Sequence, residues 1–267
     1  MLLPPELIDH IFSFLQQNIS ALKACSKAHP LYSRLAERYL YTDLTVDLLG
    51  VSELHKQLSW NSRLLDYPRS LEIRGGSRFY FKPMIPLLIM PMVPRMANLM
   101  SLRIIGIPCS FGQYEEFIST FTNCLQSSSI EQLDLTYLYD FPLSVLDNGK
   151  NIKKLTLFDC TAKEEPISSS PSSSSLETLI LSGKPNPDVH VWAIHRVTRL
   201  TSLGLRGPDL DWTGVPGLLT ACSNSLTTLH LGIWHDCMRY PFVSITFIDI
   251  YISHRFKYIL PRLCWSG

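Results

Sequence analysis

Histidine, cysteine and aspartate residues gather in one short stretch of the chain, where they could bind a metal ion or form a Cys–His nucleophilic pair. The stretch contains His230, His235, Asp236 and Cys237. A structural zinc site needs four ligands, and a catalytic zinc site needs three protein ligands and an open position. Only His235 and Cys237 are close enough to act together, and no third or fourth ligand follows at a suitable spacing. The sequence therefore predicts no metal site here.

The short motifs that mark common catalytic sites are absent from the sequence. It has no P-loop, no GxGxxG after a predicted strand, no G-x-S-x-G elbow and no HExxH. The seven cysteines are widely spaced and form no CxxC pair, which argues against a disulfide framework or a zinc ribbon. Cys25, Cys124 and Cys160 fall on apolar faces and are predicted to be small core residues. We expect no catalytic residue and no cofactor, which leaves a cysteine- or metal-dependent hydrolase with little support.

Length and charge limit the classes of protein that this chain can represent. Its 267 residues suffice for one or two domains with a sizeable core. The 24 Lys and Arg balance the 23 Asp and Glu, so a strongly basic nucleic-acid binder is not expected. Charged residues make up 18% of the chain, below the usual ~25%, which suggests that a partner covers part of the surface. With no signal-peptide pattern and no apolar window of ~18 residues, we expect a cytoplasmic and/or nuclear protein without a membrane partner.

The first forty residues predict three short helices. Apolar residues recur at helical spacing from Leu7 to Leu15, after two prolines that a first helical turn tolerates. A second helix is expected after the Asn18–Ser20 cap region, ended by His29 and Pro30, and a third from Leu31 to Leu40. Such a small unit gains stability from an attached domain or a partner.

This opening segment resembles the F-box family. The F-box pattern Leu-Pro-x-Glu-Leu/Ile-x-x-x-Ile-Phe-x-x-Leu is matched by Leu3-Pro4-Pro5-Glu6-Leu7-Ile8-Asp9-His10-Ile11-Phe12-Ser13-Phe14-Leu15. The resemblance implies that the segment docks on the Skp-family adaptor of an SCF cullin-RING ubiquitin ligase and, through it, on the cullin. The adaptor-binding residues that it implies are Leu3, Pro4, Leu7, Ile8, Ile11, Phe12, Leu15, Leu22, Cys25 and Tyr32. The alternative is an ordinary amphipathic helical hairpin that packs on the rest of the protein.

One short phrase, apolar-x-x-Leu-x-apolar, recurs through the rest of the chain. Its leucine returns after 22 to 31 residues, at Leu44, Leu71, Leu102, Leu133, Leu155, Leu179, Leu203 and Leu229. Each Leu-x-apolar unit predicts a short strand with two inward side chains, and successive strands are expected to pair in parallel around one core. Helical stretches are expected between strands, around Phe117–Leu125, Val189–Val197 and Gly217–Cys222. The segment with Pro83, Pro86, Pro91 and Pro94 is too rich in proline for one regular helix.

The repeats resemble leucine-rich repeats, since Leu155, Leu157 and Cys160 fit the pattern L-x-x-L-x-L-x-x-N/C. An F-box followed by such repeats resembles the F-box/leucine-rich-repeat architecture, including divergent fungal examples. The fold class that this implies is α/β, with a three-helix F-box over residues 1–42. An irregular leucine-rich-repeat solenoid with parallel strands follows over 43–235, and a segment without repeats over 236–267.

The side chains between and beside the inward leucines are expected to face the concave side of the sheet. Those expected to bind a substrate are Glu72, Arg74, Arg103, Asp134, Thr156, Phe158, Arg206 and His230. Their mixed charges suit a protein partner better than a phosphate backbone, although several of them could merely solvate the sheet. With the F-box resemblance, they favour a substrate-recognition subunit of a ubiquitin ligase that is not itself an enzyme. The alternative is a non-ligase binding scaffold whose F-box is only an N-terminal cap.

Two further segments do not follow the repeat. Serines over residues 168–175 predict an inserted linker, with regulatory phosphorylation as the alternative. Residues 236–267 are rich in aromatic and β-branched side chains. They are expected either to fold back as a hairpin that covers the Leu229–Leu231 layer with Phe247 or Ile250, or to pack poorly as a product of truncation or splicing. We favour the second alternative.

Overall fold

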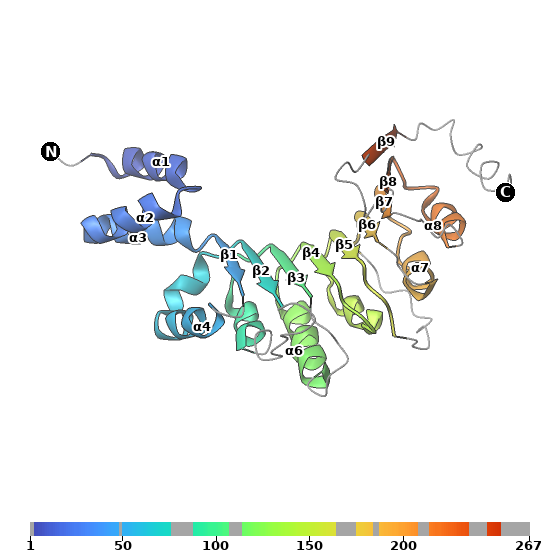
Figure 1. Cartoon of the computed structure of the whole chain (residues 1–267), viewed down its shortest axis with the longest axis horizontal. Coiled ribbons are helices and arrows are strands. Elements are labelled where there is room, and N and C mark those ends of the chain that lie inside the picture. Colours follow the sequence, from blue (N-terminus) through green and yellow to red (C-terminus); the bar gives the residue numbers. More distant parts are fainter. Residues whose placement is uncertain are drawn as a thin grey trace, which may run out of the picture.

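The elements of the chain alternate between short strands and helical segments (Figure 1). The computed structural model describes residues 3–47, 50–75, 88–106, 114–163, 175–183, 187–207, 214–234 and 245–251. The helices are α1 (Pro5–Leu15), α2 (Ile19–Ala28), α3 (Pro30–Leu40), α4 (Val51–Trp60), α6 (Tyr114–Ser127), α7 (Pro187–Ile194) and α8 (Val215–Cys222), with 3-10 helices η1 (Ser62–Asp66), η2 (Met90–Arg95) and η3 (Leu143–Asn148). The strands are β1 (Asp43–Val46), β2 (Ser70–Arg74), β3 (Ser101–Ile105), β4 (Gln132–Thr136), β5 (Lys154–Phe158), β6 (Thr178–Ser182), β7 (Ser202–Gly207), β8 (Thr228–Trp234) and β9 (Ile245–Tyr251).

The first three helices form a small unit with a core of its own. Proline occupies the first turns of α1 and α3, where its missing N–H costs no hydrogen bond. Asn18 caps α2 by accepting a hydrogen bond from the Ala21 amide at 3.0 Å. The core consists of four buried side chains, Ile8, Phe12, Leu22 and Ala36. The three helices predicted from the sequence, and the break between the second and the third at His29 and Pro30, are confirmed.

The strands β1 to β9 form one sheet, in which they lie side by side in the order of the sequence. Strands β1 to β8 pair in parallel, and their leucines lie directly opposite one another from strand to strand. This column contains Leu44, Leu71, Leu102, Leu133, Leu155, Leu179, Leu203 and Leu229. All eight are buried, and the most exposed, Leu44, keeps only 8% of its surface. The predicted α/β class, parallel strands and buried leucine column are confirmed.

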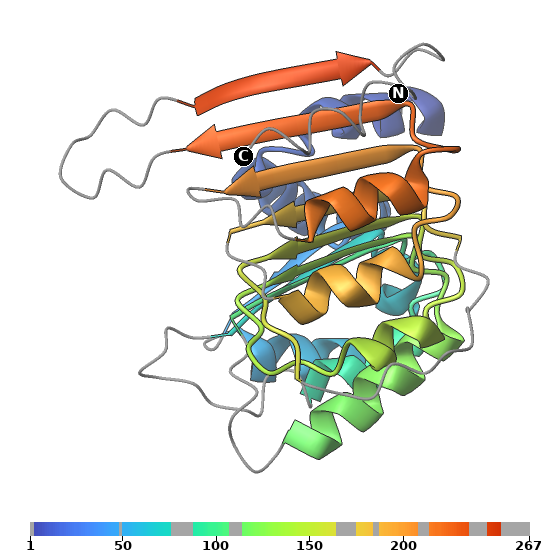
Figure 2. The same ribbon diagram turned by 90° about the vertical axis from the view of Figure 1, so that its right-hand side faces the viewer.

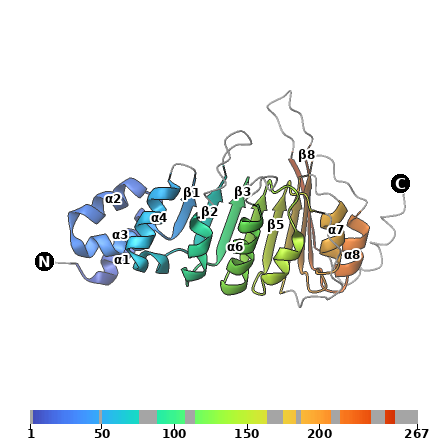
Figure 3. The same ribbon diagram turned by 90° about the horizontal axis from the view of Figure 1, so that it is seen from below.

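The helical segments after the first unit cover one face of the sheet, and the strands line the concave side (Figures 1 and 3). Helix α6 buries Phe117, Phe121, Cys124 and Leu125 against the sheet, as the sequence predicted. Of the proline-rich segment, residues 76–87 lie outside the described part. The remainder forms the 3-10 helix η2 rather than a regular helix.

The last strand, β9, runs in the opposite direction to the other strands of the sheet. β9 pairs antiparallel with β8, and Ile250 lies opposite Leu229 in the register (Figure 2). The backbone of residues 245–251 therefore has the antiparallel pairing with β8 that the hairpin alternative requires, and the packing of this segment stays a prediction. The expected burial of Phe247 and Ile250, the serine-rich segment 164–174, and the trio His235, Asp236 and Cys237 lie outside what the structure describes.

Polar contacts fix the first three helices to the start of the sheet. Arg63 of η1 pairs with Glu37 of α3 at 2.7 Å. The Tyr41 hydroxyl, just after α3, donates to Gln57 Oε1 of α4 at 2.9 Å. These two side-chain contacts link α3 and the residue after it to η1 and α4.

A buried ion pair joins parts of the chain that are far apart in sequence. Arg196, which follows α7, is 6% exposed and donates through Nε and Nη2 to both carboxylate oxygens of Asp147 in η3. Its guanidinium lies 4.9 Å from the Trp192 ring, and Nη1 donates to the Trp192 carbonyl at 3.0 Å. No local sequence pattern indicates Asp147 as the partner of Arg196.

We expect Arg196→Met to lower the free energy of unfolding by about 3–5 kcal/mol, because it leaves the Asp147 carboxylate without its partner in a largely buried site. The double variant Arg196→Met/Asp147→Leu should recover much of that loss, since it removes both charges. Urea unfolding followed by circular dichroism measures both effects. A single variant as stable as the wild-type protein would show that the pair contributes nothing.

Candidate functional site

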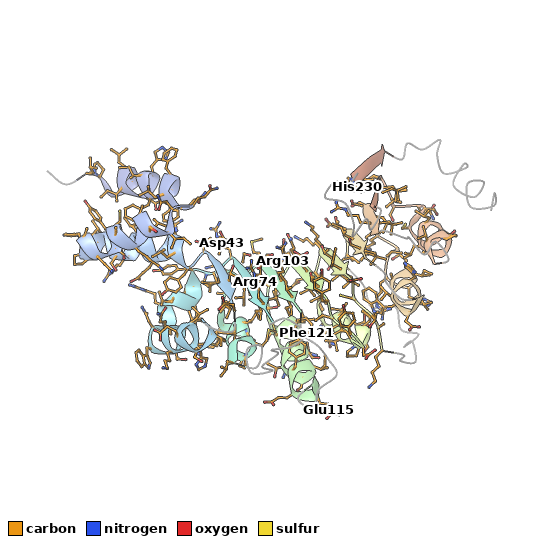
Figure 4. The ribbon with its side chains drawn as sticks, viewed as in Figure 1. Asp43, Arg74, Arg103, Glu115, Phe121 and His230 are labelled. Atoms are coloured by element: carbon orange, nitrogen blue, oxygen red, sulfur yellow. The ribbon has the colours of Figure 1, made fainter. Side chains whose placement is uncertain are left out.

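The concave face of the sheet carries the outward side chains of every strand. Because side chains alternate along a strand, the residues between the inward leucines face away from the core. All eight substrate-binding residues predicted from the sequence lie at such outward positions, from Glu72 on β2 to His230 on β8. Figure 4 shows Arg74 and Arg103 on the part of this face formed by β2 and β3, and His230 on the part formed by β8. The structure therefore brings together only some of the predicted residues.

Four of the predicted residues form a continuous charged cluster across three strands, which we call the charge ladder: Arg74, Glu72, Arg103 and Asp134. Glu72, Arg103 and Asp134 lie directly opposite one another in the parallel register. Arg103 donates through Nη1 to Glu72 at 3.3 Å and through Nη2 to Asp134 at 3.1 Å. Arg74 pairs with Glu72 from the same strand, and Gln132 Nε2 donates to Asp134 at 3.3 Å. Because positive and negative side chains alternate at adjacent positions, each charge in the ladder is stabilised by an opposite charge beside it.

The charge ladder keeps Arg103 firmly protonated. Partial burial disfavours the charged guanidinium, but the hydrogen bonds and negative charges of Asp134 and Glu72 outweigh this effect and raise the pKa of Arg103 above its usual value. The side chain is therefore held in one geometry by carboxylates on two neighbouring strands.

Beside the charge ladder, Tyr137 and Phe158 form a second feature, which we call the aromatic ledge. Their rings meet edge to face with centroids 5.3 Å apart. Tyr137 is 41% exposed and has a φ of 57°, a left-handed conformation that is unusual for a bulky residue. Its amide donates to the Phe158 carbonyl at 2.9 Å, which holds the backbone in this conformation.

Sequence reasoning named Phe158 but missed Tyr137. The residue after the strand has positive φ on four successive strands, at Gly106, Tyr137, Asp159 and Gly183. In each case its amide donates to the carbonyl of the last or next-to-last residue of the following strand. Glycine at two of the four positions reveals the requirement for positive φ. Aligning the repeats on their leucines would have shown that Tyr137 occupies a position where the neighbouring repeats have glycine or aspartate, which tolerate positive φ.

The other predicted concave residues lie at different distances from the charge ladder. Thr156 adjoins the ladder on β5, opposite Asp134, whereas His230 on β8 is four strands from Asp134 in the same row. Arg206 lies two strands beyond Phe158. Ile180, between Thr156 and His230, packs over Gly204, where an added Cβ would lie 3.2 Å from its side chain. The distant arm is thus a separate part of the face.

The residues predicted to bind an adaptor divide into two groups in the helical unit. Leu3, Leu7 and Ile11 are exposed by 52%, 51% and 46%, and Pro4 is exposed as well. Ile8, Phe12 and Leu22 are buried in the small core, and Leu15, Cys25 and Tyr32 pack against it. Ile8, Phe12 and Leu22 therefore face the other helices, whereas the exposed group is the one accessible to a partner, and adaptor contact stays a prediction for both groups.

The exposed face of α1 is longer than the sequence motif indicated. Phe14 is 75% exposed and lies three residues after Ile11, on the same side of the helix. Leu3, Leu7, Ile11 and Phe14 together form what we call the apolar stripe. Ile19 and Leu31, on the neighbouring helices, are exposed by 58% and 41%. The helical period alone would have added Phe14 to the motif.

A polar cleft of about 600 Å³ lies where the helical unit meets the first strands. Its lining includes two arginines, Arg38 and Arg69, and two aspartates, Asp43 and Asp66. Asn98 donates to the Asp66 carbonyl at 2.6 Å along its wall. With charges of both signs, the lining favours no single class of ligand.

Three buried cysteines, Cys124, Cys160 and Cys222, are unsuited to nucleophilic chemistry. Burial raises the pKa of Cys124 to about 12 and those of Cys160 and Cys222 to about 11. Cys124 and Cys160 are the small core residues that the sequence predicted, and Cys25 is only partly buried. Within the described residues, no group of His, Cys, Asp and Glu side chains has the arrangement to hold a metal ion.

In the part of the chain that the structure describes, every helix is too short or too polar to cross a membrane. No protein-family model matches the chain. A search of curated proteins likewise finds no match.

We expect the stability contributed by the Cys160 thiol to disappear at alkaline pH. Its folded-state pKa of about 11 exceeds the ordinary value of 9.0, so the folded state holds the proton more tightly. The contribution is complete below pH 9 and falls as pH rises towards 11, by about 1–2 kcal/mol. Relative to Cys160→Ala, the wild-type protein should therefore lose stability between pH 7.5 and 10.5 in urea unfolding. Val145→Ala, a buried change without a titrating group, should show a constant difference, and the same constancy for Cys160→Ala would contradict the prediction.

Proposed function

We propose that this protein is a substrate-recognition subunit of an SCF-type cullin-RING ubiquitin ligase. In this proposal, α1 to α3 form an F-box that binds the Skp-family adaptor. The sheet and its helices form an irregular leucine-rich-repeat solenoid whose concave face binds a protein substrate. The observation that carries the proposal is the apolar stripe of Leu3, Leu7, Ile11 and Phe14 on the outer face of α1.

The energetics of the apolar stripe favour a protein partner. Fully burying a leucine, isoleucine or phenylalanine side chain contributes about 1.5–3 kcal/mol, so covering the stripe would supply a large part of a stable interface. Ile19 and Leu31 are two further exposed apolar side chains on the neighbouring helices. Contiguous apolar patches on soluble proteins usually mark interaction sites.

The small core of the helical unit supports the same proposal. Only four side chains are fully buried within it, so the unit has little stability of its own. A partner that binds the folded helices stabilises them by mass action. Binding and local folding are therefore coupled in this unit.

The side-chain contacts between the helical unit and the segment around the first strands suit a receptor that works by proximity. In this proposal, the Arg63–Glu37 and Tyr41–Gln57 contacts hold the adaptor-binding helices at a set angle to the concave face. A substrate held there would be presented in a defined position to a ubiquitin-loaded enzyme on the adaptor side. The chemistry would be carried by other subunits, and the gain would come from effective concentration. The protein would then act in the cytoplasm or the nucleus.

The alternative is a non-ligase binding scaffold in which the helical unit only caps the sheet. A cap needs an apolar face towards the sheet but no exposed stripe on its outer side. The exposure of Leu7, Ile11 and Phe14 therefore favours the adaptor-binding function over the scaffold.

We expect the double variant Leu7→Asp/Ile11→Asp to weaken binding to a purified Skp-family adaptor by at least about 30-fold, because it places charges in the centre of the interface. Isothermal titration calorimetry measures the affinity, and circular dichroism confirms that the helices remain folded. Trp60→Asp is the matched control, since Trp60 is 86% exposed at the end of α4, away from the stripe.

Phe12→Ala separates folding from contact in the same unit. Because Phe12 is a core residue, this change should weaken adaptor binding only in proportion to the loss of helical structure. A folded wild-type protein that does not bind the adaptor, or a stripe variant that binds normally, would rule out the proposed function.

A further inference from the structure

The charge ladder is layered, with its anions beneath its cations. The Glu72 and Asp134 side chains are only 16% and 8% exposed, whereas those of Arg74 and Arg103 are 57% and 49% exposed. Although the four formal charges cancel, the layer that faces a partner consists of guanidinium groups. The carboxylates below act as supports that fix the positions of these groups.

The two guanidinium groups retain hydrogen-bond donors for a ligand. A guanidinium has five N–H donors. Arg103 uses three of them on the carboxylates of Glu72 and Asp134, and Arg74 uses its Nε on Glu72. The other donors of both side chains have no partner among the residues that the structure describes. They match the planar oxygens of a carboxylate.

The local charge also favours one negative group. Lys154 on β5 lies beside Gln132 in the register, and Gln132 itself donates to Asp134 of the charge ladder. Asp43, at the other end of the same row, carries the opposite charge to Lys154. The preference for a negative group therefore comes from the outward guanidinium groups of Arg74 and Arg103.

The aromatic ledge lies at a fixed distance from these donors. Strands in a sheet are spaced ~4.8 Å apart, so Arg103 on β3 and Phe158 on β5 are separated by roughly 10 Å across the sheet. Arg74 and Phe158 occupy the same row three strands apart, which gives roughly 14 Å. An extended peptide advances ~3.3 Å per residue and covers these distances in three to four residues.

From this juxtaposition of outward guanidinium groups and the aromatic ledge, we infer that the concave face binds an extended acidic–apolar peptide segment of a protein partner. A carboxylate of the segment pairs with Arg74 and Arg103. An apolar side chain three or four residues away packs on Tyr137 and Phe158. The inference rests on the proposed function and deepens it by defining the substrate class, but the binding that it describes needs no adaptor.

Fluorescein-labelled degenerate peptide pools test the inference by fluorescence anisotropy on the full chain. The first pool carries Asp or Glu three or four residues from Phe or Leu, and the other positions are mixtures of small polar residues. A second pool carries Lys or Arg in place of the acid, and a third carries Ser in place of the apolar residue. A fourth replaces the acid with phosphoserine.

We expect the first pool to bind at least about 10-fold more tightly than the second and third pools, and the binding to weaken between 50 and 500 mM salt. Equal binding of the acidic and basic pools overturns the inference. Binding of the phosphoserine pool alone overturns the assignment to a carboxylate and identifies a phosphate as the ligand group.

Matched variants locate the binding on the concave face. Arg74→Gln and Tyr137→Ser should each weaken the first pool at least about 5-fold, whereas Tyr137→Phe should retain binding because it keeps the ring. Arg95→Gln in η2 and Trp60→Ser in α4 are exposed controls outside the concave face and should have no effect. Unchanged affinity in both Arg74→Gln and Tyr137→Ser would overturn the placement.

Adaptor affinity is measured on the same protein preparations. Loss of peptide binding with intact adaptor binding refutes this inference alone. Loss of adaptor binding with intact peptide binding refutes the ligase function alone, so the two failures are distinguishable.

Discussion

Each strand from β1 to β7 buries only two or three inward-facing side chains, so no such strand is stable without the strands beside it. The leucine column from Leu44 to Leu229 is the consequence, because register-matched leucines give a strand of four to seven residues a shared core. The same constraint fixes the outward positions at one strand spacing from each other. A charged cluster such as Glu72, Arg103 and Asp134 can therefore be assembled from three segments that are distant in sequence, and its geometry is inherited from the core beneath it.

The repeated part of the fold could be predicted from the sequence because the leucine pattern that produces it recurs along the chain. The leucines recur with a fixed local pattern, and strand direction, register and the helical face of α6 follow from it. What could not be read depends on single contacts between distant segments. The pairing of Arg196 with Asp147 joins positions 49 residues apart, and no local pattern links them. The left-handed Tyr137 was hidden for a different reason, since a tyrosine gives no sign of positive φ unless the repeats are compared with one another.

The helical unit shows what helical spacing in a sequence leaves undetermined. A run of apolar residues with helical spacing contains two faces, and the motif does not state which face packs inward. In the structure Ile8 and Phe12 point to the small core, whereas Leu7, Ile11 and Phe14 point to solvent. One face supports folding, and in the proposed function the other face serves recognition. That division explains how a unit with so few buried side chains can retain a large exposed apolar surface.

The reversed direction of β9 bears on how copies of the protein meet. A sheet of parallel strands ends in an open edge at each side, and the edge of β8 would be a template for the first strand of another copy. Head-to-tail addition of that kind has no natural end and produces filaments. An antiparallel strand on β8 occupies the template and presents a different hydrogen-bonding pattern to any further strand. With β9 in place, the parallel strand β8 is no longer the outer edge of the described sheet, and a parallel first strand from another copy would meet β9 instead.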